Sequence, residues 1–100
     1  MKKLRFTNKV VEDLTQIWDY TLNKWSENQA DIYYSLLIEN CKEISSNPGT
    51  GNKYSRIREG LLGRKTGKHI IFFREVAENE IEIVRILHEQ MDLMNRSEEK

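Results

Sequence analysis

Cysteine and proline are almost missing from this sequence, which has one of each, at Cys41 and Pro48. A single cysteine excludes a disulfide within the chain, and one thiol cannot build a zinc site. No segment approaches the roughly 20 apolar residues of a membrane span, and the opening MKKLRFTNKV lacks the apolar centre of a signal peptide. These absences favour a protein of the reducing cytoplasm that makes no contact with a membrane.

Motifs for metals and phosphates are lacking as well. The two histidines, His69 and His88, stand far apart in the sequence, and no paired carboxylates recur at helical spacing near them. The Gly-Thr-Gly sequence at 49–51 is not followed by the Gly-Lys-Ser/Thr of a phosphate-binding loop. We therefore expect neither a metal nor any other cofactor.

Charge of one sign is not in excess. The 100 residues include 16 Lys or Arg and 16 Asp or Glu, so the formal net charge is zero. Phosphate contacts dominate affinity for nucleic acid, and neutrality therefore weighs against direct, sequence-specific DNA binding. The balance is uneven, with seven bases and one acid from Lys53 to Arg74, then eight acids and three bases from Glu75 to Lys100. The basic stretch is either a solvated surface of mixed charge or a face for an acidic partner.

The first half of the chain has the pattern of one short strand and two helices. KKLRF alternates polar and apolar residues, which is typical of a strand with Leu4 and Phe6 on one face. Thr7 or Asn8 can cap a helix that is expected from Lys9 to Trp25. Its apolar stripe recurs at helical spacing and comprises Val11, Leu14, Ile17, Trp18, Leu22 and Trp25.

A second amphipathic helix follows at once, with Ser26 or Asn28 as its cap. Its stripe comprises Ala30, Tyr33, Leu37, Cys41 and Ile44. Because few residues join the two helices, we expect an antiparallel hairpin, which ends in SSNPGTGN, where Pro48 cannot continue a helix. The hairpin's aromatic residues could stack nucleic-acid bases, but their helical spacing favours contacts within the core. These residues are Trp18, Trp25, Tyr33 and Tyr34.

The second half changes to the shorter period of strands. RIREGLLG is expected to place Ile57 and Leu61 on one side and Arg56 and Arg58 on the other. KHIIFFREV and IEIVRIL are β-branched and aromatic, and predict a strong hairpin. The sequence thus predicts an α+β fold in the order β-α-α-β-β-β. An N-terminal strand joins a twisted antiparallel sheet, at its edge or within it, and the helical hairpin packs on one face. We expect one domain over residues 1–92 and a polar, disordered tail over 93–100.

Four basic side chains on neighbouring predicted strands suggest RNA cleavage, namely His69, Arg74, Arg85 and His88. Such a reaction needs an acid, a base and a cation for the charge on the phosphorus centre. The alternative is a polar strand end with no chemistry. If Arg85 faces solvent, Arg85→Ala should leave the fold largely intact. An exposed sheet edge or a groove beside the hairpin could instead accept a partner strand or helix.

Several stretches, taken in order, resemble the ParE toxins of bacterial toxin–antitoxin systems, within the wider RelE/ParE group. They cover about Leu4 to Asp92, and the last of them is the most specific. The pieces are DLTQIWDYTLNKW, QADIYYSLL, NPGTG, IREGLL, HIIFFR and IEIVRILHEQMD. The resemblance implies a helical hairpin on a twisted antiparallel sheet, inhibition of DNA gyrase, and inactivation by a ParD-like antitoxin whose C-terminal segment wraps the toxin.

The RelE branch of the same group cuts messenger RNA on the ribosome, and this chain fits that branch less well. RelE-like nucleases tend to be strongly basic and often have a tyrosine near the C-terminus, whereas no tyrosine follows Tyr54 here. The chain also departs from the ParE pattern His-x-Arg-Met-Asp, because Gln90 stands in place of the arginine. This departure implies weaker toxicity or gyrase affinity.

Three functions therefore remain open from the sequence. The first is a gyrase-inhibiting toxin without catalysis. The second is a ribosome-dependent mRNA endonuclease that uses Arg74, Arg85 and His88, and the third is an inactive toxin-like domain that only binds a partner. The candidate residues for contact with a target or partner are Arg56, Arg58, Arg74, Arg85, His88, Met91 and Asp92.

Overall fold

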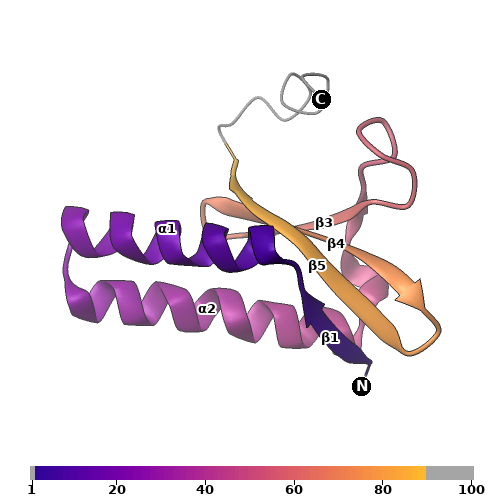
Figure 1. Ribbon diagram of the computed structural model, residues 1–100, viewed down its shortest axis with the longest axis horizontal. Helices are drawn as coiled ribbons and strands as arrows, with labels where there is room; N and C mark the ends of the chain where they lie inside the picture. The colour runs from indigo at the N-terminus through magenta and orange to yellow at the C-terminus, as the bar shows by residue number, and fades with distance from the viewer. Residues whose placement is uncertain (1, 90–100) are drawn as a thin grey trace.

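Two long helices pack against one face of a five-stranded sheet in the computed structural model, which describes residues 2–89 (Figure 1). The elements in chain order are β1 (Lys3–Phe6), α1 (Asn8–Lys24), α2 (Glu27–Ser46), the short 3-10 helix η1 (Pro48–Thr50), β2 (Asn52–Lys53), β3 (Leu62–Thr66), β4 (His69–Ala77) and β5 (Glu80–His88). The predicted α+β architecture is confirmed. The tail expected at 93–100 lies outside the described residues, and a single domain over 1–92 stays a prediction.

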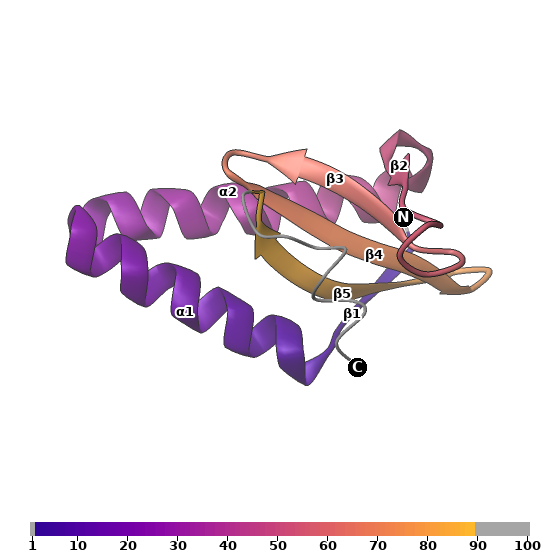
Figure 2. The same cartoon turned by 90° about the horizontal axis from the view of Figure 1, so that it is seen from above.

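Both helices begin at a hydroxyl side chain that accepts a free backbone N–H. Thr7 Oγ1 accepts from Val10 N–H at 3.1 Å, and Ser26 Oγ accepts from Gln29 N–H at 3.1 Å. These caps set the start of α1 one residue before the predicted position. The helices then run side by side, and the closed end of their hairpin extends beyond the sheet (Figures 1 and 2).

The face of α1 that meets the core differs from the predicted stripe. Val10 and Leu14 are buried, whereas Val11 is 53% exposed and Trp25 is 69% exposed. At the start of the helix two valines are adjacent, so periodicity alone could not choose between them. At its end, the last turn belongs to the part of the hairpin that extends past the sheet. The prediction is therefore wrong at both ends of the stripe and right at Leu14 and Ile17.

The sheet is mixed rather than wholly antiparallel. Its strand order is β1-β5-β4-β3-β2, and the edge strand β1 runs parallel to β5 with Leu4 opposite Ile81. The remaining neighbours are antiparallel. Parallel neighbours need a long connection, and here the helical hairpin and three strands lie between the two. The predicted antiparallel sheet is right for β2 to β5 and wrong for β1.

The predicted strand RIREGLLG is wrong except at its last two residues, Leu62 and Gly63, which begin β3. Residues 54–60 form turns, in which Ile57 N–H donates to the carbonyl of Tyr54 at 3.0 Å. Gly60 has φ +81°, a left-handed conformation that interrupts extended backbone before β3 begins. The apolar side chains of Ile57 and Leu61 pack against the second face of the sheet, which this turn segment covers.

The core has two parts, one on each face of β4. Ile71 and Phe73 are fully buried in the main cluster between the helices and the sheet. Ile70 and Phe72 point the other way and pack under the turn segment. This alternation along β4 fixes the side on which each neighbouring side chain lies. Within residues 2–89, neither helix is long and apolar enough to cross a membrane.

Candidate functional site

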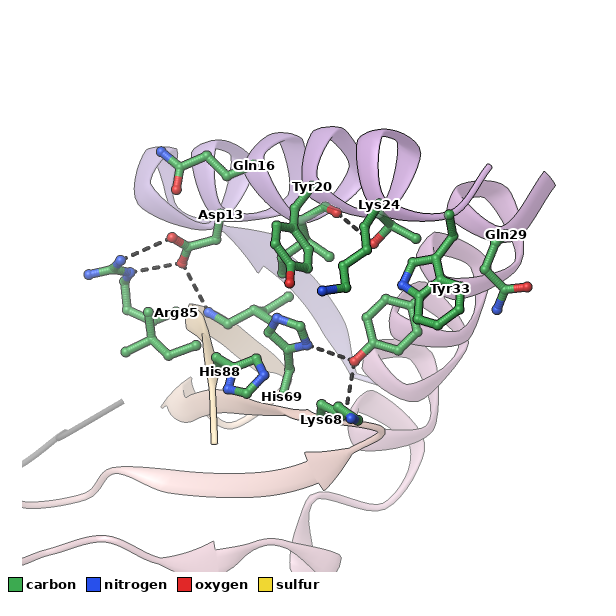
Figure 3. Close-up of a pocket in the computed structure, with 15 residues that line it drawn as sticks. Asp13, Gln16, Tyr20, Lys24, Gln29, Tyr33, Lys68, His69, Arg85 and His88 are labelled. Atoms are coloured by element: carbon green, nitrogen blue, oxygen red, sulfur yellow. Dashed lines mark hydrogen bonds and ion pairs between the residues drawn. The ribbon is translucent and has the colours of Figure 1, made fainter. Parts of the chain in front are cut away.

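A pocket of about 810 Å³ opens where the closed end of the hairpin extends past the sheet (Figure 3). One wall is formed by α1 and another by the start of α2, while the beginning of β4 and the end of β5 contribute the remaining side. The polar side chains that matter most for its chemistry are Asp13, Lys24, Tyr33, His69, Arg85 and His88. They come from four elements, so only the folded chain brings them together.

An ion pair between Arg85 and Asp13 joins β5 to α1 at one end of the pocket. Arg85 donates from Nε to Asp13 Oδ2 at 2.8 Å and from Nη2 to Oδ1 at 3.0 Å, and Ile86 N–H donates to Oδ2 at 3.0 Å. Asp13 is only 7% exposed. Hydrogen bonding to this carboxylate raises the pKa of Arg85. The pair thus satisfies a buried carboxylate and holds the helix to the strand.

A bulge in β5 places Arg85 where it can reach this carboxylate. Phe72 lies opposite Arg85 while Phe73 lies opposite Ile83, so the register skips Val84. Val84 is the residue left without a partner in this register, and its carbonyl accepts a hydrogen bond from Thr7 Oγ1 at 2.9 Å. Bulges re-aim side chains in this way and often lie beside functional sites.

Tyr33, His69 and His88 form a second cluster inside the pocket. His69 and His88 face each other across β4 and β5, with ring centroids 5.2 Å apart. Tyr33 Oη lies 2.6 Å from His69 Nδ1 and accepts the backbone N–H of Lys68 at 3.1 Å. Burial, followed by the charge of His88, lowers the pKa of His69 to about 4. His69 is therefore neutral at pH 7 and able to share one proton with Tyr33.

Tyr33 also closes tightly over the turn between β3 and β4. Gly67 has φ +59°, and a Cβ there would lie 2.8 Å from the Tyr33 ring. The same ring is tilted against His69, with centroids 5.5 Å apart. Only glycine fits under the tyrosine at this position. This close packing fixes one side of the pocket relative to α2.

The mouth of the pocket combines exposed aromatic rings with a lysine. Tyr20 is 62% exposed and Trp25 is 69% exposed, and both line the pocket. The ammonium of Lys24 lies 5.9 Å from the centre of the Tyr20 ring. Aromatic side chains and cations are enriched at protein interfaces, so this mouth is a candidate binding surface.

The proposed nuclease residues are not brought together. Arg74 follows Phe73 in β4 and so points to the opposite face, where its Nε donates to Glu82 at 2.9 Å. Arg85 binds Asp13, and His88 contacts His69. Two of the three candidates lie at the pocket and the third lies on the other side of the sheet.

The predicted basic face is smaller in the structure than in the sequence. Arg64 pairs with Glu43 at 2.5 Å, and Lys65 pairs with Glu89 at 2.9 Å. Arg56 and Arg58 are exposed in the turn segment at 54–60, away from the pocket. Three other positions of interest, at 90–92, lie outside the described residues; they are Gln90, Met91 and Asp92.

Sequence reasoning missed several residues of the pocket. Asp13 lies on the buried side of α1 between Val10 and Leu14, and an acid on an apolar face was the available signal. Trp25 was assigned to a core stripe because the overlap between the hairpin and the sheet cannot be derived from periodicity. Tyr33 was also assigned to a core stripe, and it does pack against the main core while it lines the pocket. Among residues 2–89, no group of three or more His, Cys, Asp or Glu could hold a metal ion.

Comparison with known proteins gives a consistent family. The family described as "ParE toxin of type II toxin-antitoxin system, parDE" matches residues 4–93. The chain is 35% identical over 80 residues to Toxin ParE1 of Mycobacterium tuberculosis, which is 80% of this chain and 82% of that protein. It is 32% identical over 92 residues to Toxin ParE1 of Caulobacter vibrioides, with 92% and 94% covered.

A solved structure shows the same fold. It is described as a chromosomal ParDE TA system from P. aeruginosa, and its similar chain has 23% sequence identity and a TM-score of 0.76. The alignment covers 88% of this chain and 96% of the other. The strand, the helical hairpin and the sheet are therefore arranged as in that protein.

Proposed function

The chain belongs to the ParE toxin family of type II toxin–antitoxin systems, and from this premise we propose that it inhibits DNA gyrase and is held inactive by a ParD-like antitoxin. The observation that carries the proposal is the family match over residues 4–93. The inhibition would come from binding, without a covalent step by the toxin. The chain would act in the cytoplasm, where its target lies.

The pocket between the hairpin and the sheet supports antitoxin binding. Its mouth exposes Tyr20 and Trp25, and apolar aromatic surface of this kind is the usual anchor of a protein interface. Arg85 and His88 would contribute to this contact from β5. An amphipathic segment laid between the two helices would bury both rings.

The opposite side of the molecule supports a separate contact with the target. Arg56, Arg58 and Arg74 are exposed away from the pocket. We assign them to target recognition, together with Met91 and Asp92, which follow β5 in the sequence. The dispersal of Arg74, Arg85 and His88 over two faces supports a binding rather than a cleaving toxin.

Supercoiling of relaxed plasmid by purified gyrase tests the proposal. Added wild-type protein should reduce supercoiling, and the ribbon-helix-helix protein encoded by a neighbouring reading frame should restore it. Arg56→Ala with Arg58→Ala should weaken the inhibition, whereas Lys42→Ala, on the exposed side of α2, should not. Unchanged supercoiling at large molar excess of the wild-type toxin would contradict the proposed target.

Gln90 provides a second variant for the same assay. The ParE pattern has arginine at this place, so Gln90→Arg should lower the toxin concentration needed for half-inhibition by roughly three- to tenfold, the effect of one added charged contact. Equal inhibition by both proteins would remove Gln90 from the target contact.

One observation favours a second candidate, ribosome-dependent mRNA cleavage. His69 is neutral at pH 7, lies beside His88 and contacts the hydroxyl of Tyr33, which is a possible acid–base arrangement. A translating extract containing the protein would then accumulate cut messages, and His69→Gln would abolish the cuts. Intact messages with the wild-type protein would eliminate this candidate, including the earlier set of Arg74, Arg85 and His88.

A further inference from the structure

We propose that the pocket contains a carboxylate-binding subsite at Lys24 and Lys68, which selects a partner segment that carries an aspartate or glutamate beside an apolar anchor. The inference rests on the proposed antitoxin binding and specifies its chemistry. It assigns the acidic group to the two lysines and the apolar anchor to Tyr20 and Trp25.

The first argument is the local charge. The chain as a whole is neutral, but the side chains that line the pocket include three cations, Lys24, Lys68 and Arg85, and a single carboxylate, Asp13. Asp13 is already bound by Arg85 and by the N–H of Ile86. Two positive charges at this described surface therefore have no carboxylate of the pocket to neutralise them.

The second argument is the state of the two lysines. Within residues 2–89, Lys24 contacts the ring of Tyr20 but has no carboxylate within ion-pair distance. Lys68 lies near Glu89, which also interacts with its charge, but the ion pair of Glu89 is with Lys65 at 2.9 Å. Other bases of the same chain, such as Arg64 and Arg74, do have acidic partners.

The third argument is the surface beside the lysines. Figure 3 shows Lys24 directed into the pocket next to Tyr20, with Tyr33, His69 and Lys68 across from it. A carboxylate that enters here would meet the ammonium groups and the hydroxyl of Tyr20, while an adjacent apolar side chain would cover the exposed ring of Trp25. Once a partner segment covers these rings, the ion pairs beside them would be partly shielded from water and so worth more than pairs on an open surface.

Binding of the antitoxin encoded by the neighbouring reading frame tests this subsite. Affinity would be measured by isothermal titration for the wild type, Lys24→Gln, Lys68→Gln and the double variant. Each single change should weaken binding by about fivefold, and the double change by at least that factor; the two effects need not multiply, because both lysines contact the same carboxylate. Lys42→Gln removes the same charge from the exposed pair with Glu39, outside the pocket, and should bind within about twofold of wild type.

A charge exchange identifies the partner group. Lys24→Glu should abolish most of the affinity for the antitoxin. When the acidic residues of the antitoxin are changed to lysine one at a time, only one of these changes should restore the affinity of Lys24→Glu. Raising the salt concentration should weaken the wild-type complex more than that of the double variant. Melting curves of the free variants would confirm that each is folded.

The outcomes separate this inference from the proposed function. If the wild type binds the antitoxin and the double variant binds within twofold of it, the carboxylate subsite is wrong and antitoxin binding stands. If the wild type does not bind, both are wrong. If the double variant still binds the antitoxin but no longer binds a short single-stranded RNA, the two lysines bind phosphate groups and the carboxylate subsite is wrong.

Discussion

Replacement of Arg85 by alanine should destabilise the fold, although this arginine is partly open to solvent. Arg85 supplies two of the three hydrogen bonds that Asp13 accepts. After the substitution, the carboxylate, whose side chain is only 9% exposed in the wild type, keeps only the N–H of Ile86. The sequence-based expectation that Arg85→Ala leaves folding intact applied only to a solvent-facing side chain, and this one is bound to α1.

The size of the effect follows from the burial of the two partners. Removal of one partner from a fully buried pair costs roughly 3–5 kcal/mol, because an uncompensated charge remains. The side chain of Arg85 is 30% exposed, so water can reach its place in the variant. We therefore expect about 2–3 kcal/mol of lost unfolding free energy. In a chain of this length, that corresponds to a melting temperature lower by roughly 10–20 °C.

Urea unfolding at pH 7, followed by circular dichroism, measures this loss. Asp13→Asn combined with Arg85→Ala should be more stable than Arg85→Ala alone, because no unpaired charge remains and the amide oxygen can still accept from Ile86 N–H. Arg58→Ala, in the exposed turn segment, should change the free energy by less than about 0.5 kcal/mol. A variant Arg85→Ala within that same range, or no recovery in the double variant, would refute the reasoning.

Three further predictions concern stability. Gly67→Ala should lower the free energy of unfolding in urea by about 2–3 kcal/mol, because the new Cβ would meet Tyr33 at 2.8 Å. Gly60→Ala, also at positive φ but with nothing within 4 Å of the new Cβ, should lower it by only about 1 kcal/mol. Equal losses in the two variants would contradict the contact with Tyr33. Ile83→Ala should cost about 2–5 kcal/mol, since the side chain is 0% exposed in the main core, and a loss below about 1 kcal/mol would contradict that packing. The pKa of His69 is about 4 in the folded state and 6.5 before burial. The stability that the neutral imidazole contributes to the fold is therefore fully present above pH 6.5 and is lost as the pH falls toward 4. Solvent screening limits this loss to about 2 kcal/mol. Urea unfolding at pH 7 and 4.5 should show a larger decrease for wild type than for His69→Gln, and parallel decreases would contradict the assignment.

The elements that the sequence predicted well are those whose side chains decide their own structure. β4 and β5 are rich in β-branched and aromatic residues, and β4 is buried on both faces over residues 70–73, which favours a strand. Likewise, Ser26 caps α2 through its own hydroxyl. Local chemistry was enough in these places.

The remaining features depend on contacts between distant segments. The turn segment at 54–60 carries an alternating pattern, but Ile57 packs from a turn onto the second face of the sheet. The bulge at Val84 directs Arg85 toward Asp13, which lies 72 positions earlier in the sequence. Neither the bulge nor the overlap of the hairpin with the sheet leaves a periodic trace. For this reason the pocket could not be predicted, although the sequence singled out His69, Arg85 and His88 individually.

The parallel pairing of β1 with β5 has a consequence for synthesis of the chain. Thr7, which follows β1, donates its hydroxyl to the carbonyl of Val84, which is made 77 residues later. The strand β5 also supplies Arg85 and His88 to the pocket. A nascent chain that has not yet released β5 from the ribosome therefore has neither the completed sheet nor the binding surface. The proposed binding surface therefore forms only after β5 has been synthesised and has left the ribosome.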